Sequence, residues 1–218
     1  MGMTARKALL AAAIAAAALA GCRSEGDIVV QQGVGITALR TVCPAVGVVD
    51  YTGDITLFQP AEARTADALD VTASITNVRS QCNDTGEQVY ATATFDVVGQ
   101  RRDTNGARSV ELPYYTTVVR GGNSVVAKRV GTVTLNFADG QARAQAQATA
   151  GAYIDRTAAT LPDDIRQRIT RRRRAGDEDA AVDPLTEPEV RAAVARATFE
   201  LLVGFQLTQD QLAYNATR

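Results

Sequence analysis

The chain has 218 residues, of which 46% are apolar, and its 23 basic and 24 acidic residues give a net charge of −1. That length and apolar content suffice for one domain with a hydrophobic core, while a near-neutral charge and 5% aromatic residues exclude a strong pull toward nucleic acid. The sequence contains no histidine, which excludes Ser-His and Cys-His pairs and imidazole metal ligands. We therefore expect no metal and no cofactor.

The N-terminus has the parts of an export signal, which we place at residues 1–21. Arg6 and Lys7 precede an uncharged apolar run, Ala8 to Ala20, which is shorter than the ~20 residues that span a bilayer. The run ends in Leu19-Ala20-Gly21-Cys22. This stretch resembles the lipobox of bacterial lipoproteins, and the resemblance implies that the Cys22 thiol receives a diacylglycerol and becomes the new N-terminus. Two alternatives remain: an ordinary secretory cleavage site beside a cysteine that is not lipidated, and an anchor helix that is not cleaved.

The lipobox resemblance also implies a location. Residues 22–27 read as a lipidated tether that reaches at most ~20 Å, so the domain would sit close to a membrane. In bacterial lipoproteins an Asp directly after the lipidated cysteine resembles an inner-membrane retention signal, and this chain has Arg23 there. The resemblance therefore implies a lipid anchor in the outer membrane, on its periplasmic side.

The three cysteines divide into one lipid attachment site and one pair. Lipidation of Cys22 leaves Cys43 and Cys82, and the oxidising periplasm favours a disulfide between them. Closing this loop would stabilise the fold by roughly 4 kcal/mol on the chain-entropy estimate. A redox-active pair is the alternative, but such pairs usually have C-x-x-C spacing.

Residues 28–158 have the pattern of an antiparallel β-rich domain. Alternation from Leu69 to Ile75 slips in phase near Asn77, which predicts a β-bulge that brings Val78 and Cys82 onto one face. Further along, three turn signals separate β-rich runs: Asn105-Gly106, Gly121-Gly122 and Asp139-Gly140. Three such turns in succession predict a four-stranded antiparallel meander. Pro113 predicts that its strand lies at an edge or carries a bulge there.

The last strand of this predicted meander has alanine at every second position from Ala142 to Ala152. Strict alternation after Asp139-Gly140 indicates a strand with a smooth, small-residue face. Two interpretations remain open for that face. It is either packed core under large side chains of a facing layer or a shallow groove for an extended partner or ligand.

Residues 159–218 are predicted to form a helical C-terminal segment packed on the β domain. Pro162 opens a short helix with Ile165 and Ile169 on one face, and a charged linker follows at 171–185. The longest helix is expected at Glu187 to Val203, ending before Gly204. Its apolar stripe consists of Val190, Val194, Ala197 and Leu201. A box formed by Thr208 and Gln211 is expected to cap a final short helix.

Taken together, these patterns predict a mainly β fold, an antiparallel β-sandwich with C-terminal helices. The expected function is that of an outer-membrane, lipid-anchored accessory, scaffold or binding protein without catalysis. Its partners would be the membrane, through the lipid anchor, and an envelope protein, but no nucleic acid. The alternatives are a carrier that binds envelope polymer or lipid, and an envelope hydrolase that uses carboxylates or a Ser-Lys pair with Lys128, the only lysine after the signal.

Overall fold

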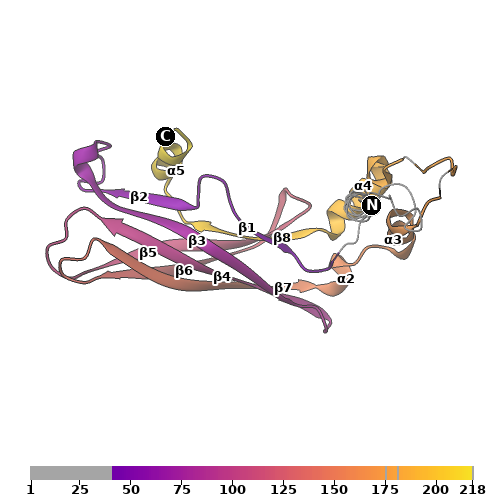
Figure 1. Cartoon of the computed structure of the whole chain (residues 1–218), viewed down its shortest axis with the longest axis horizontal. Coiled ribbons are helices and arrows are strands. Elements are labelled where there is room, and N and C mark those ends of the chain that lie inside the picture. The colour runs from indigo at the N-terminus through magenta and orange to yellow at the C-terminus, as the bar shows by residue number, and fades with distance from the viewer. Residues whose placement is uncertain (1–40, 175, 181, 218) are drawn as a thin grey trace, which may run out of the picture. The chain divides into compact units, whose positions relative to one another are not determined.

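The structure is a computed structural model that describes residues 41–174, 176–180 and 182–217 (Figure 1). Residues 41–171 and 182–217 form one compact unit, the main unit, and residues 172–174 and 176–180 belong to a second.

The main unit is mainly β, and two four-stranded sheets pack together, which confirms the predicted sandwich (Figure 1). In spatial order, the first sheet contains β1 (Ala45–Val48), β8 (Phe199–Phe205), β5 (Arg108–Arg120) and β6 (Ser124–Phe137). The second sheet contains β2 (Asp54–Phe58), β3 (Leu69–Asn83), β4 (Gln88–Arg101) and β7 (Arg143–Asp155). One large hydrophobic cluster lies between the two sheets and takes side chains from both.

The predicted four-stranded meander is wrong. Only the Gly121-Gly122 turn joins neighbouring strands, β5 and β6, as a hairpin. The loops that contain Asn105-Gly106 and Asp139-Gly140 instead cross between the sheets, because β4 pairs with β7 and β5 pairs with β6 and β8. A turn dipeptide fixes a local reversal of the chain, and this reversal serves equally for a hairpin or for a change of sheet.

Arg101 supplies a physical reason for the crossing. Its side chain is only 2% exposed and donates hydrogen bonds to carbonyl oxygens in both crossing loops. These acceptors are the backbone oxygens of Thr104, Gly106, Ala138 and Gln141, at 2.8–2.9 Å. Asp139 adds a bond across the same pair of loops by accepting from the Gly106 N–H at 2.7 Å. The two loops are therefore held side by side.

The bulge in β3 is confirmed. The pairing of β3 with β4 shifts register between Thr76 and Arg79, and Asn77 takes a φ of 52°. Val78, within the bulge, packs against the core, and beyond it Cys82 pairs with Ala91, a core residue of β4. The extra residue therefore returns the apolar side chains to the inner face, as the phase slip predicts.

Pro113 does not lie on an edge strand, since β5 is central, with β8 on one side and β6 on the other. Its missing N–H is accommodated in another way. The ladder between β5 and β8 begins only at Tyr114, one residue later, and the Pro113 carbonyl accepts from the Gln206 N–H just beyond β8. Pro113 therefore lies just outside the ladder between β5 and β8.

The alanine face of β7 is packed core, so of the two interpretations left open for it the packed core is confirmed and the groove is wrong. Ala150 is buried, and four further alanines pack against the main cluster: Ala144, Ala146, Ala148 and Ala152. β7 and β6 are in contact although they belong to different sheets. Small side chains on β7 allow this close approach of two sheet edges.

The helix expected at Glu187 to Val203 is shorter than predicted. The helix α4 (Pro188–Ala197) ends at Ala197, and the chain continues as β8, parallel to β1 and antiparallel to β5. In β8 every second side chain is buried: Phe199, Leu201, Val203 and Phe205. This period of two fits a strand, so Leu201 belongs to the sandwich core and not to a helical stripe, and Gly204 is not a helix stop.

The remaining helices follow the sequence signals more closely. The short α2 (Arg156–Ala159) follows β7, and α3 (Asp163–Thr170) buries Ile165 and Ile169, as predicted. These two residues form a second cluster with Val190, Ala193 and Val194 of α4. The 3-10 turns η2 (Ala66–Ala68) and η3 (Pro184–Thr186) precede β3 and α4.

The final helix, α5 (Gln209–Thr217), contacts β2. Thr208 and Gln211 exchange the expected capping hydrogen bonds, at 2.9 and 3.2 Å. Asn215 ties the helix to the sandwich, because its Nδ2 donates to the backbone oxygens of Tyr51 and Asp54 at 2.8 Å.

In the second unit, most of the described charged side chains are exposed, as expected of a solvated linker. Arg173 is the exception among them. It is buried, and its Nε lies 3.3 Å from Asp179 Oδ2. The Arg174 N–H donates to Asp177 Oδ2 at 2.9 Å.

Candidate functional site

Cys22, the predicted lipid attachment site, lies outside the described residues, as do the signal and the tether. Lipidation therefore stays a prediction. Among the described residues, no helix has the length and apolar character needed to cross a membrane.

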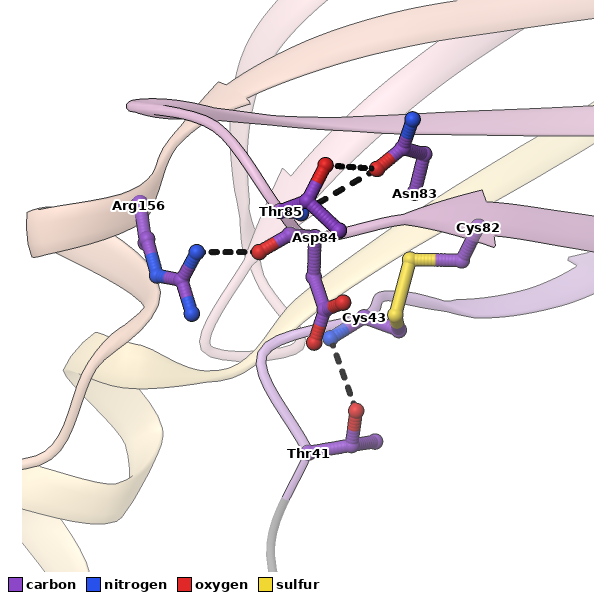
Figure 2. The surroundings of a disulfide bond; sticks show 7 residues. All are labelled: Thr41, Cys43, Cys82, Asn83, Asp84, Thr85 and Arg156. Carbon is purple, nitrogen blue, oxygen red and sulfur yellow. Dashed lines mark hydrogen bonds between the residues drawn. A yellow bond between two sulfur atoms is a disulfide. The ribbon is translucent and has the colours of Figure 1, made fainter.

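The Cys43–Cys82 disulfide is present and crosses between the two sheets (Figure 2). The two Cα atoms lie 6.0 Å apart, within the ordinary range for a disulfide. Cys43 stands just before β1 in the first sheet, and Cys82 lies near the end of β3 in the second. The bond therefore joins the layers at this position, and a structural role follows directly from its place in the fold.

The surroundings of the disulfide hold backbone in place (Figure 2). The Cys43 N–H donates to Thr41 Oγ1 at 3.1 Å. In the β3–β4 turn, Asn83 Oδ1 accepts from the Thr85 N–H and hydroxyl, and Arg156 donates to the backbone oxygens of Asp84 and Gly86. These are structural contacts, because each supplies a hydrogen bond to a polar group of a turn or a loop.

An apolar cavity of about 320 Å³ lies beside the disulfide. One wall is the segment from Thr41 to Ala45, and the opposite walls come from the helices and the start of β8. The lining side chains there are Ala159, Leu161, Val194, Ala197, Thr198 and Phe199. This volume is at the lower limit for a small-molecule site, and Thr41 and Thr198 are the polar side chains in its lining.

The outer face of the second sheet carries an exposed pair of tyrosines. Tyr90 of β4 and Tyr153 of β7 pair across the strands and stack, with ring centroids 4.5 Å apart. Successive rows along the same face carry Thr92 with Gly151 and Thr94 with Thr149. Exposed aromatic rings beside hydroxyl groups offer both stacking area and hydrogen bonds.

Three carboxylates of the main unit serve as hydrogen-bond acceptors at a β-bulge, a turn and a helix cap. Asp96 accepts from Asn77 Nδ2 at 2.6 Å, and this bond lowers the pKa of Asp96 below its ordinary value. Bonds from Asn105 likewise lower the pKa of Asp103, and bonds from Thr157 and Ala158 lower that of Asp155. A lowered pKa keeps a carboxylate ionised at neutral pH, which suits acceptance of hydrogen bonds and not proton donation.

Lys128, the candidate for a Ser-Lys pair, is exposed on β6 and lies against an aromatic ring instead of a serine. Its Nζ is 4.8 Å from the centre of the Tyr115 ring. The residue directly across the ladder is Thr117, whose hydroxyl already donates to the Ala127 carbonyl at 2.9 Å. No group of three or more Cys, Asp or Glu residues that could hold a metal ion occurs among the described residues.

Sequence analysis missed one surface, the first half of β6. Every residue from Ser124 to Val130 is exposed, and both Val125 and Val126 are more than half exposed. A signal existed in Val125-Val126-Ala127-Lys128-Arg129-Val130, because this run does not alternate, whereas the rest of the strand, Thr132 to Phe137, does. Such a run is typical of a strand without a single buried face.

Comparison with known proteins gives no relative: no family model, no curated protein and no solved structure matches this chain.

Proposed function

We propose that this protein is a lipid-anchored accessory or scaffold protein of the outer membrane, which acts in the periplasm by binding an envelope protein and not by catalysis. The observation that carries the proposal is the sequence Leu19-Ala20-Gly21-Cys22 at the end of a short apolar segment. The disulfide across the sandwich supports it, since disulfides persist in oxidising compartments such as the periplasm.

The binding role is supported by the kind of surface that the main unit exposes. The first half of β6 presents apolar and basic side chains on an edge strand, which is the form of a protein-binding surface. The carboxylates with shifted pKa accept hydrogen bonds at a β-bulge, a turn and a helix cap, and Lys128 lies on Tyr115. These observations favour binding over hydrolysis.

Mass spectrometry of the mature N-terminus tests the anchor. We expect an N-terminal peptide that begins at Cys22 and carries acyl mass, with two or more chains because a single chain gives only marginal attachment. Cys22→Ser should block lipidation and abolish its acyl mass, whereas Cys43→Ser should leave that mass in place. An unmodified peptide that begins elsewhere would contradict the proposal.

A second function, binding of an envelope polymer, is favoured by one observation, the exposed stack of Tyr90 and Tyr153. Co-sedimentation with purified envelope polysaccharide tests it. Tyr90→Ala with Tyr153→Ala should remove the protein from the pellet if the stack binds polymer. Tyr51→Ala, at another exposed tyrosine of the main unit, serves as the control. Equal sedimentation of all variants would contradict this function.

A further inference from the structure

The first half of β6, Ser124 to Val130, is here named the open half. β6 is the last strand of its sheet, and β5 is its only hydrogen-bonded neighbour among the described strands. A strand in that position has one row of backbone N–H and C=O groups without a partner strand. Its side chains are exposed on both faces along the whole open half.

Other sheet edges of the main unit are protected. The edge strand β2 is in contact with α5, whose Asn215 binds backbone on either side of the turn before it. The edge strand β7 is in contact with β6 of the other sheet. β1 has only four residues and follows the disulfide directly. Natural proteins blunt edges in these ways, and the open half has none of these covers.

The open half combines apolar side chains with cations on both faces. Lys128 stands across from Thr117 and Arg129 across from Thr116, and consecutive strand residues point to opposite faces. Neither cation forms an ion pair with a described residue. An added strand would thus meet positive charge above and below the sheet.

The positive charge of Lys128 and Arg129 determines which kind of strand can pair with the open half. Two copies of the chain that paired edge to edge would bring two Lys128 and two Arg129 side chains into one short ladder, where like charges repel. A segment with acidic residues among apolar ones would instead gain attraction from the cations and contact with Val125, Val126 and Val130.

We propose that the open half of β6 binds an extended acidic and apolar segment of a partner protein by strand addition, so that the segment becomes a fifth strand of this sheet. Main-chain hydrogen bonds would supply a general part of the affinity, and Lys128 and Arg129 would select acidic side chains. The inference rests on the proposed function only in naming an envelope protein as the source of the segment.

A synthetic peptide of alternating Glu and Val, labelled for fluorescence anisotropy, tests the proposal with the full lipoprotein in detergent. We expect it to bind, a Lys and Val peptide of equal length not to bind, and backbone N-methylation of alternate residues to abolish binding. Lys128→Glu with Arg129→Glu should weaken binding about tenfold, with Arg143→Glu, an exposed arginine of β7, as the matched control.

The peptide comparisons use the unaltered protein, so they test the proposal even if the double variant fails to fold. Equal binding of the acidic and basic peptides, or undiminished binding of the N-methylated one, would overturn the proposal. Dimers of the unliganded protein that Val126→Arg disrupts would also overturn it in favour of a second copy. Failure of the peptide to bind leaves lipidation of Cys22 untouched, and failure of lipidation leaves the peptide result untouched, so the two proposals are tested separately.

Discussion

The two halves of β6 share one strand and one partner strand, β5, yet their surroundings differ completely. In the half from Val133 to Phe137, here named the closed half, Val133, Leu135 and Phe137 are buried in the main cluster. In the open half Val130 is 61% exposed, whereas Val133, three residues later, is 4% exposed. Local sequence therefore makes the strand, while burial depends on what the rest of the chain places over it.

The largest expected effect lies at the crossing loops next to the closed half. Arg101→Ala leaves four backbone carbonyls without their charged donor and removes a guanidinium 5.4 Å from the centre of the Phe137 ring. We expect a loss of about 3–5 kcal/mol in the free energy of unfolding, measured by urea denaturation. Arg143→Ala, at an exposed arginine, should change it by no more than about 0.5 kcal/mol. Equal effects would show that Arg101 does not hold the loops.

Leu201→Ala tests the core that covers the closed half. Leu201 is fully buried in β8, so the substitution should lower the free energy of unfolding by about 2–5 kcal/mol. The control is Leu212→Ala, because Leu212 on α5 is 41% exposed. An unchanged denaturation midpoint for Leu201→Ala would place β8 outside the cooperative fold.

Val133→Ala and Val130→Ala compare the halves with the same chemical change in one strand. Truncating the buried Val133 side chain should lower the free energy of unfolding by about 2 kcal/mol, because the core between the two sheets loses apolar contacts. Val130→Ala should stay within about 0.5 kcal/mol of the parent. Similar losses at both positions would remove the distinction between the halves.

The smallest expected effect is a pH dependence at Asp103, in the loop that Arg101 holds. Hydrogen bonds from Asn105 lower the pKa of Asp103 in the folded protein, so the stabilisation is present above the unfolded-state pKa near 3.8 and disappears as the pH falls through the folded-state value. Asp103→Asn should therefore be less stable than the parent at pH 7, and the two should converge in strong acid. A difference that persists below pH 2 would contradict this cause.

Where the chain supplied its own local pattern, sequence analysis was reliable. The alternation of β3 and its phase slip at Asn77 predict the observed bulge, and the helix signals at Pro162 and Thr208 predict α3 and α5. The cysteine pairing was predicted from the compartment that the lipobox resemblance implies, and it too is confirmed. Each of these features depends on few residues or on one chemical constraint.

The structural predictions were wrong where contacts between segments distant in the sequence determine the structure. The local sequence Asn105-Gly106 predicts a hairpin. In the structure Arg101 instead binds this turn to the loop that follows Phe137, which is distant in the sequence. The spacing of Val190, Val194, Ala197 and Leu201 fits a helix, but the residues from Phe199 onward pair with β1 and β5 as β8, so the helix ends at Ala197. The open half of β6 was missed although its run from Val125 to Val130 does not alternate, because that local signal does not show which described segments leave both faces uncovered.

Amide hydrogen exchange along β6, with and without the alternating Glu and Val peptide, tests the central claim most directly. We predict slow exchange in the closed half in both samples, and fast exchange on the free side of the open half that becomes slow when the peptide binds. The protection should be absent with the N-methylated peptide. Strong protection of the open half in the free protein, or no change on addition of peptide, would contradict the account of β6 as a binding edge.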